Sequence, residues 1–510
     1  MEPGSTAERA YSMRWWTLIV IAVSVLIVVI DASIVNIALP TLQRELNATG
    51  TELQWIINAY IMVFASLMLT TGTLGDRLGR KRILQVGILL FAAASLAAAF
   101  SASALQLIAW RAVMGIGGAM ILPATLAIIT NVFPVEERGK AIGVWAGLNG
   151  IGIALGPIIG GAIIDGVGWN WIFLINLPIA AIALTAGWFL IPESRDPRPK
   201  RADWPGTVLS ALALANLVFG LIKGSDWGWT HPIVVMTLCW SIVLITMFVR
   251  WERYTKHPMM ELGFFRNPRF SAGVGAVSIT ALGQIGITFG LTLYMQFVQG
   301  YTALETGIRF VPLAAGIMMG AGSSYKLVKF LGTTRVIGLG FILLTATVIV
   351  AALWQVDTAY WQVGAVFFGL GFFLGYIAAP ATDAIMSALP EARAGIGSAM
   401  NSVSRMVAGA LGIAIIGSVL NSVYRSSFDD AASTIPTLPP DVASAARDSV
   451  GAAVTIADKL PPALGEPLAA VARESFMDAW QVMAIVSGYI AITGAFFVFK
   501  YMPARRAPGD

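Results

Sequence analysis

The stretch WWTLIVIAVSVLIVVIDASIVNI, residues 15–37, decides the fold class of this chain. It holds some twenty apolar residues, the number that an α-helix needs to cross a bilayer core of ~30 Å. One carboxylate, Asp31, interrupts it near its far end. An acid inside a membrane span costs about 2.5–3.5 kcal/mol on insertion scales, so it requires a partner or a function. Asp31 either satisfies a polar neighbour in a helix bundle, or it binds a proton or a cation at a cavity.

The whole chain has the composition of a polytopic membrane protein. Of its 510 residues, 57% are hydrophobic and 12% are charged, and the mean hydropathy is +0.76. Soluble domains carry about 25% charged residues. Apolar windows predict fourteen membrane-spanning helices, which makes the fold all-α. The basic residues recur in short clusters between apolar stretches rather than in one patch, so we expect contact with the lipid bilayer and not with nucleic acid.

Residue types that bind metals are scarce. The single cysteine, Cys239, excludes an internal disulfide and a thiolate metal cluster. The two histidines, His231 and His257, precede prolines at the edges of spans and fit no metal-ligand spacing. The glycine-rich loops lack the strand-and-helix context of a phosphate-binding loop. We therefore expect no metal and no cofactor, and no catalytic grouping of a membrane enzyme.

The distribution of positive charge predicts the orientation. With the amino terminus placed inside, 24 of the 33 Lys and Arg residues fall in inner segments and seven in outer ones. Such an excess marks the cytoplasmic side, and an even number of spans puts both termini there. We expect a multi-pass protein of the bacterial cytoplasmic membrane. One outer segment, 424–478, is long and acidic; it either forms a helical hairpin that gates the mouth or serves only as a linker.

A basic, glycine-containing segment, GTLGDRLGRKR (72–82), fills the inner loop expected between the second and third spans. Glycines permit a tight turn between two helices, and the acid at its centre can engage arginines or a helix amino end. A basic turn could also be only a determinant of topology. We expect a conformational latch formed by Gly72, Asp76, Arg77, Gly79 and Arg80.

The fourth span, in LIAWRAVMGIGG (107–118), places an arginine inside the membrane. At 1.5 Å per residue, Arg111 and Asp31 lie at a similar depth, ~10 Å from the outer ends of their spans. A helix movement that changed the distance between them would load or release a proton, because a nearby cation alters the proton affinity of a carboxylate. A static pair that holds two helices in register is the alternative.

The fifth span contains GIALGPIIGG, residues 152–161. Its proline removes a backbone donor and bends the helix, while its glycines let a neighbouring helix approach closely. The coincidence of kink and small residues predicts a mobile helix pair that involves Gly152, Gly156, Pro157, Gly160 and Gly161.

Aromatic and amide side chains within the spans are candidates for a substrate cavity. They can bind flat lipophilic cations through cation–π contacts, or they can serve as hydrogen-bonding groups between helices. The candidates are Asn58, Tyr60, Trp145, Asn149, Gln284, Tyr294 and Gln296.

These motifs resemble the signatures of the major facilitator superfamily in order and position. Segment 72–84 is similar to its inner-loop motif, 107–119 to its fourth-helix motif, and 152–161 to the fifth-helix motif associated with antiporters. Segment 30–40, IDASIVNIALP, resembles the first-helix motif of the fourteen-helix drug:proton antiporters of the QacA/EmrB type. The resemblance covers essentially the whole chain. One departure is the segment 323–332, which lacks the Asp-Arg pair of a second loop motif.

The resemblance implies a major facilitator fold with two six-helix bundles and two inserted helices. The implied domains are residues 1–190, then 191–270 with the linker and the inserted helices, then 271–510 including the outer segment 424–478. It implies a proton-coupled multidrug efflux antiporter that works by alternating access, with Asp31 and Arg111 as the proton-coupling residues. Span ten carries no acid, which favours monovalent or zwitterionic substrates. We expect small-molecule drugs and protons as partners of a monomer. A dedicated exporter of an endogenous metabolite, lipid or antibiotic remains the alternative.

Overall fold

The computed structural model describes residues 13–195, 203–256, 258, 262–389, 394–433, 435 and 438–503, and within them every regular element is a helix. Parts of the termini and of the expected inner linker, residues 196–202, lie outside the described residues. The first group of helices is α2 (Arg14–Leu46), α3 (Gly50–Leu78), α4 (Arg80–Ala99), α5 (Ala104–Val132), α6 (Val135–Val167), α7 (Trp171–Leu174) and α8 (Asn176–Leu190).

Two helices, α9 (Trp204–Trp227) and α10 (Pro232–Tyr254), and a short 3-10 turn, η1 (Leu262–Arg266), come next. The second group is α11 (Pro268–Leu293), the π-helix η2 (Tyr294–Val298), α12 (Ala303–Arg309), α13 (Val311–Leu331), α14 (Thr333–Ala351), α15 (Tyr360–Ser387), α16 (Ala394–Ala432), α17 (Pro440–Ala446), α18 (Val450–Ala457) and α19 (Pro462–Tyr501).

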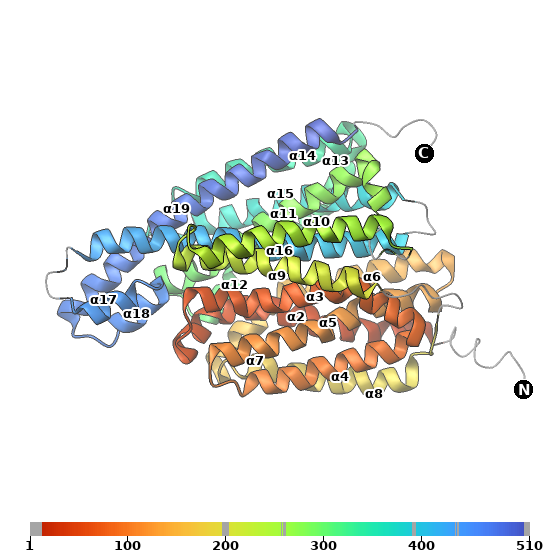
Figure 1. Cartoon of the computed structure of the whole chain (residues 1–510), viewed down its shortest axis with the longest axis horizontal. Coiled ribbons are helices and arrows are strands. Elements are labelled where there is room, and N and C mark those ends of the chain that lie inside the picture. The colour runs from red at the N-terminus through yellow and green to blue at the C-terminus, as the bar shows by residue number, and fades with distance from the viewer. Residues whose placement is uncertain are drawn as a thin grey trace, which may run out of the picture.

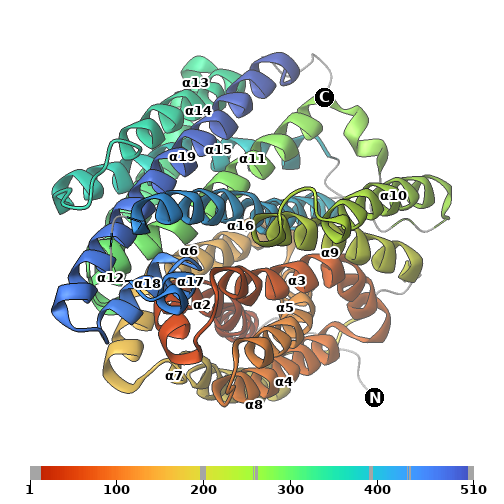
Figure 2. The same ribbon diagram turned by 60° about the vertical axis from the view of Figure 1, so that its left-hand side comes forward.

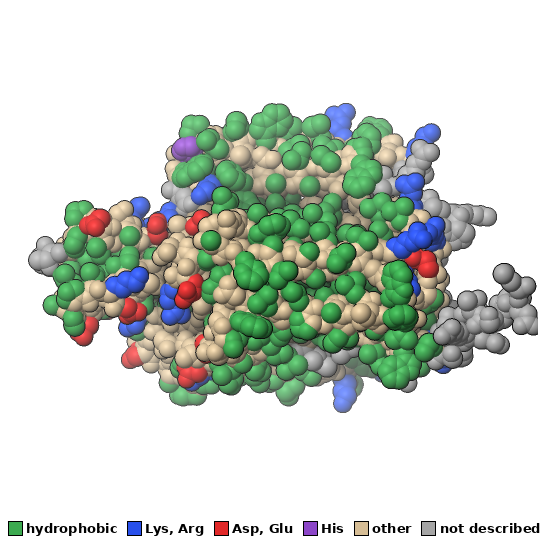
Figure 3. Space-filling view, turned by 90° about the horizontal axis from the view of Figure 1, so that it is seen from below, with side chains coloured by type: hydrophobic (Ala, Val, Ile, Leu, Met, Phe, Trp, Pro, Cys, Tyr) green, Lys and Arg blue, Asp and Glu red, His purple; other side chains and the backbone are tan. Residues whose placement is uncertain are grey.

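Eleven helices of the described chain are long and apolar enough to cross a membrane, or up to twelve if the bent α3 is one span. Apolar side chains cover the middle of the molecule, and most charged side chains gather at its two ends (Figure 3). Helices α6 and α13 lie where two further spans are expected and have 33 and 21 residues. The protein is therefore a multi-pass membrane protein, while the count of fourteen stays a prediction.

The two groups of helices pack in the same pattern. In the first group, α3 and α4 pack on α5, and α2 packs on α6 and α8. In the second group, α13 and α14 pack on α15, and α11 packs on α16 and α19. The groups lie against each other, with α16 next to α3 (Figures 1 and 2). A Cβ built on Gly50 of α3 would lie 3.1 Å from the Asn421 side chain of α16.

Helix α9 contacts both groups, and α10 packs along α9 (Figure 2). In its first turn, Thr207 shares a hydrogen bond with Thr70 of α3. Near its other end, the Leu221 carbonyl accepts a hydrogen bond of 2.8 Å from Ser418 of α16. Helix α9 therefore bridges the two groups at one side.

The segment 72–82 is helical over most of its length, which differs from the loop that the sequence predicts. Residues 72–78 form the last two turns of α3, and α4 begins at Arg80. Only Gly79 separates the two helices, with φ at 119°. This left-handed region favours glycine, because a Cβ would clash with the backbone there. The turn is thus made by a single residue, and the polar side chains of the motif project from helices.

The segment 424–478, which is expected on the outer side, is largely helical in its described residues, as its proline positions suggest. Helices α17 and α19 begin at Pro440 and Pro462, where a missing N–H costs nothing. The segment docks on the first group through a hydrogen bond between Gln43 of α2 and Ser449 at the start of α18. The Tyr424 hydroxyl donates to the Ala446 carbonyl over 3.0 Å.

Candidate functional site

Asp31 and Arg111 form an ion pair in the centre of the first group of helices. Arg111 Nη1 lies 2.5 Å from Asp31 Oδ2, and the two side chains are 1% and 0% exposed. Arg111 Nε donates to the Ile56 carbonyl over 3.2 Å, and the guanidinium lies 4.3 Å from the ring centre of Tyr60. A carboxylate, a backbone carbonyl and an aromatic ring thus compensate this buried cation, as a charge removed from water requires.

Two further polar residues, Asn176 and Ser95, complete this cluster. Asn176 Nδ2 donates to Asp31 Oδ1 over 3.3 Å and to Ser95 Oγ over 3.0 Å. The Ser95 hydroxyl in turn donates to the Phe173 carbonyl over 2.9 Å. Both residues are fully buried. The sequence offered one signal for them: Asn176 is an amide two residues before a proline in an otherwise apolar stretch.

The glycines of the fifth-span motif bring α6 against α2 beside this cluster. Gly152, Gly156 and Gly160 recur every four residues, so they lie on one face of α6. A Cβ on Gly152 would lie 2.9 Å from Val29, and one on Gly156 would collide with Ser33. Any larger residue at these positions would push the two helices apart. Because all three are glycine, α6 packs closely along α2, the helix that carries Asp31.

The same motif also contacts the second group. A Cβ on Gly161 would lie 2.5 Å from the backbone of Ala303 in α12, and one on Gly307 would collide with the Pro157 carbonyl. The Leu304 amide of α12 donates to Asp165 Oδ2, in the last turn of α6, over 2.9 Å. Helix α6 thus lies between α2 and the second group, with close backbone contacts on both sides.

The contacts of the expected latch run within the first group. Asp76 Oδ1 accepts two hydrogen bonds from Arg80, at 2.9 and 2.8 Å, and Arg80 reaches the Ala127 carbonyl of α5 over 3.3 Å. Gly72 lies against Pro123 of α5. Arg77 is exposed. These contacts join α3, α4 and α5.

The structure does not bring the seven cavity candidates together. Tyr60 packs on Arg111, Gln296 donates across the two groups to the Ile37 carbonyl over 2.9 Å, and Tyr294 stacks on Trp354 and Trp480. Asn58 is fully buried, and its polar atoms have no hydrogen-bond partner. The Trp145 indole donates to Thr125, within the first group, and the Asn149 side chain lies outside the described residues.

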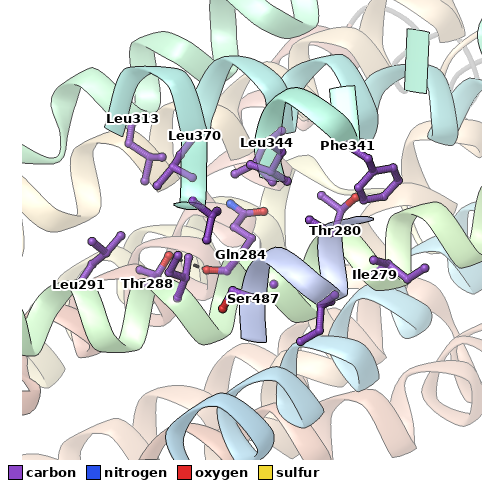
Figure 4. A pocket seen from close by; sticks show the side chains of 16 residues that line it. Ile279, Thr280, Gln284, Thr288, Leu291, Leu313, Phe341, Leu344, Leu370 and Ser487 are labelled. Carbon is purple, nitrogen blue, oxygen red and sulfur yellow. Dashed lines mark hydrogen bonds between the residues drawn. The ribbon is translucent and has the colours of Figure 1, made fainter. Parts of the chain in front are cut away.

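Gln284 lines a pocket in the centre of the second group (Figure 4). Five helices surround it: α11, α13, α14, α15 and α19. Its walls are aliphatic and aromatic, and none of the residues that line it is ionisable. The hydroxyls of Thr280, Thr288 and Ser487 donate to carbonyls of their own helices, which leaves the Gln284 amide as the donor that faces the pocket. The pocket therefore suits an uncharged group. No cluster of three or more metal-binding side chains occurs in the described part of the chain.

Comparison with known sequences identifies the family. The sequence profile of the Major Facilitator Superfamily matches residues 21–413. The chain is 33% identical to the tetracenomycin C resistance and export protein of Streptomyces glaucescens, with 100% of this chain and 97% of that protein covered. It is 30% identical to the multidrug efflux pump LfrA of Mycolicibacterium smegmatis, over 97% of each chain. It is 34% identical to the methyl viologen resistance protein SmvA of Salmonella typhimurium, over 91% of this chain and 93% of that one.

Solved structures with the same fold are more distant in sequence. A bacterial homologue of the human lysosomal transporter Spinster superposes with a TM-score of 0.68 at 17% identity, over 97% of this chain and 99% of that one. The xylose transporter XylE of E. coli gives a TM-score of 0.59 at 12% identity, over 97% and 98%. These likenesses confirm the expected fold. The chain belongs to the Major Facilitator Superfamily of membrane transporters.

Proposed function

We propose that this protein is a proton-coupled multidrug efflux antiporter of the bacterial cytoplasmic membrane, which exports lipophilic, monovalent cationic compounds. The relatives that are named for multidrug efflux, for methyl viologen resistance and for tetracenomycin C export support drug export. The observation that carries the proton coupling is the Asp31–Arg111 pair, buried in the middle of a membrane protein. An acid at such a place is a functional group by default, because its insertion is costly.

In the proposed cycle, Asp31 takes a proton from the outside and returns it to the inside. Removing one partner of a buried pair costs about 3–5 kcal/mol. One proton that crosses ~150 mV releases about 3.5 kcal/mol, at roughly 2.3 kcal/mol per 100 mV. The two energies are of similar size, so protonation of Asp31 is able to drive α2 and α5 into a different arrangement. When the proton leaves, the carboxylate becomes available to the Arg111 guanidinium or to a cationic drug.

The helix movement that follows is a rocking of two domains, residues 1–190 and 271–510, with 191–270 inserted between them. The repeated packing pattern of the two groups supports this division. Helix α6 transmits the movement, since it packs on the Asp31 helix and on α12. The segment 72–82 acts as an inner latch, and 424–478 closes the outer side through Gln43 and Ser449. The protein acts as a monomer, with both termini in the cytoplasm.

A second candidate is the dedicated export of an endogenous, uncharged metabolite. The pocket around Gln284 favours it, because that pocket offers an amide and aliphatic walls but no countercharge. Both candidates share the same proton coupling and differ in the substrate.

Ethidium accumulation in cells tests the proposal. Cells that express the wild-type protein should accumulate less ethidium than cells that express Asp31→Asn. Asp383→Asn is the matched control, since Asp383 is an exposed acid near the end of α15. Equal efflux by the wild type and Asp31→Asn removes Asp31 from the mechanism. If no lipophilic cation is moved by the wild type, the metabolite exporter is favoured.

A further inference from the structure

The side-chain amide of Asn176 is fully buried, but only its nitrogen atom has hydrogen-bond partners. Its Nδ2 atom donates to Asp31 and to Ser95, which uses both of its hydrogens. Its Oδ1 atom has no hydrogen-bond partner. A buried acceptor without a donor costs free energy, and such atoms require an explanation.

We propose that Asn176 holds Asp31 in both of its protonation states, by donating to the carboxylate and accepting from the carboxylic acid. The inference rests on the proposed proton-coupling role of Asp31. An amide is suited to this task because one end donates and the other accepts, whereas a guanidinium only donates. Arg111 can donate to an oxygen of either form, which favours the charged one, but it cannot accept from the O–H of the neutral acid; Asn176 can do both.

The exchange needs a half-turn of the amide about its Cβ–Cγ bond. Oδ1 then takes the place of Nδ2, 3.3 Å from Asp31 Oδ1 and 3.0 Å from Ser95 Oγ. A hydronium ion of the external water loses a proton and becomes water, the proton binds Asp31 Oδ1, and the new O–H donates to Asn176 Oδ1. No other covalent bond changes. The amide nitrogen moves to the position that its unpartnered oxygen had occupied.

Ser95 biases the amide toward the charged state of Asp31. Its hydroxyl hydrogen is committed to the Phe173 carbonyl, so Ser95 accepts from Asn176 and orients Nδ2 toward the carboxylate. After the half-turn, Ser95 must release Phe173 to donate to the amide oxygen. The serine therefore makes protonation of Asp31 less favourable.

Few other groups compete for this role. The titratable groups that face Asp31 are Arg111 from α5 and Tyr60 from α3. Helices α7, α8 and α18 carry no titratable residue. The other titratable residues of the helices around this cluster lie at or near helix ends: Glu52, Asp76 and Arg77 of α3; Arg80, Lys81 and Arg82 of α4; Glu136, Glu137, Arg138, Lys140 and Asp165 of α6; Arg269 of α11; Glu305 and Arg309 of α12.

Replacement of Asn176 should move the midpoint of Asp31 protonation. In Asn176→Leu, the charged form loses the stronger hydrogen bond and the neutral form the weaker one, so the midpoint should rise by roughly 0.5–1 pH unit. In Ser95→Ala, the amide loses the hydroxyl that orients it toward charged Asp31. The midpoint of Asp31 protonation should therefore rise, by a smaller amount than in Asn176→Leu. Asn176→Ser retains a donor and an acceptor and should stay close to the wild type. Ser24→Ala is the control, because Ser24 is a buried serine of α2 that bonds only to its own helix.

Infrared difference spectra of the purified protein during a pH titration provide the measurement. The carbonyl stretch of protonated Asp31 is assigned by its loss in Asp31→Asn. Asn176→Leu should shift this band to higher frequency, because the acid loses its acceptor, and should raise the midpoint.

An unchanged band and midpoint in both Asn176→Leu and Ser95→Ala overturn the inference. If Asn176→Leu does not fold, Ser95→Ala alone decides it. Absence of any Asp31-dependent band overturns the proton-coupling role itself, and this inference with it.

Discussion

The centres of the two helix groups are built on corresponding helices but have opposite chemistry. The ion-pair cluster comes from α2, α3, α4, α5 and α8, the first, second, third, fourth and sixth long helices of the first group. The Gln284 pocket is lined by α11, α13, α14, α15 and α19, which hold the same places in the second group. Asp31 and Gln284 both lie near the middle of the first helix of their group.

The centre of the first group is charged and packed with side chains, whereas the centre of the second group is uncharged and contains a small pocket. In the first group, Arg111, Tyr60 and Asn176 occupy the space around Asp31. In the second group, mostly aliphatic side chains line a small pocket into which an amide points (Figure 4). We propose a division of labour on this basis: the first group handles the proton and the charge of a cationic drug, and the second group offers a surface for the apolar part of the ligand. The following experiments test this division, from the largest expected effect to the smallest.

A disulfide between the groups should stop transport, whereas one between α3 and α9 should not. In a Cys239→Ser background, the pair Gly50→Cys and Asn421→Cys joins α3 to α16 at a close contact. If the two groups move as separate domains, oxidation should abolish ethidium efflux and reduction should restore it. The pair Thr70→Cys and Thr207→Cys is the control, because α9 should move together with α3. Efflux that continues with the first pair oxidised contradicts the domain division.

Loss of one member of the ion pair should destabilise the protein strongly. Arg111→Leu leaves Asp31 without its countercharge and should lower the free energy of unfolding by about 3–5 kcal/mol. The double variant Asp31→Leu and Arg111→Leu should recover part of that stability without recovering transport. Thermal unfolding in detergent measures the effect. A double variant that is as unstable as the sum of the single ones would show that the two charges do not interact.

A methyl group between α2 and α6 should weaken both stability and transport. Gly156→Ala places a Cβ against Ser33, and overpacking of this kind costs about 1–3 kcal/mol. Gly166→Ala is the control on the same helix, since its built Cβ has no atom within 4 Å apart from the neighbouring backbone of its own helix. The unfolding temperature and the efflux rate of both variants are the readouts. Equal behaviour of the two variants would mean that close α2–α6 packing is unimportant.

Changes in the pocket should alter substrate preference while leaving proton coupling unchanged. Gln284→Leu removes one hydrogen-bonding group, worth about 1 kcal/mol, so KM for a substrate that uses it should rise roughly fivefold. The pH dependence of efflux should not move, because Asp31 and Arg111 are in the other group. A shifted pH profile in Gln284→Leu would break the proposed division between the two centres.

The sequence predicted the membrane fold and brought attention to Asp31 and Arg111, but it could not place their neighbours. The depth of a residue in the membrane follows from the rise of ~1.5 Å per residue, so the similar depth of Asp31 and Arg111 could be predicted from the sequence. Which way a side chain points around the helix depends on packing, and this is why Asn176 and Ser95 were not among the predicted site residues. For the same reason, Tyr60 was grouped with substrate residues, although it packs on Arg111.

The inner-loop motif teaches a similar lesson. Its three glycines and basic residues suggested a loop, yet Gly72 and Gly75 lie inside α3. Hydrogen bonds of Asp76 and Arg80 and the packing of Gly72 on α5 outweigh the low helix propensity of glycine. The pocket around Gln284 left no pattern in the sequence, because it depends on how five separate helices leave space between them.

Proton release by the purified protein on substrate binding tests the central claim most directly. A lightly buffered sample is mixed with tetraphenylphosphonium, and the change in pH is recorded about one pH unit below the midpoint of Asp31 protonation, where nearly every Asp31 carries a proton. The proposed mechanism predicts release of about one proton for each cation bound by the wild type, since a cation and a proton compete for the same carboxylate. It predicts no release from Asp31→Asn, with Asp383→Asn like the wild type. Equal release from the wild type and Asp31→Asn would contradict the claim that Asp31 carries the proton.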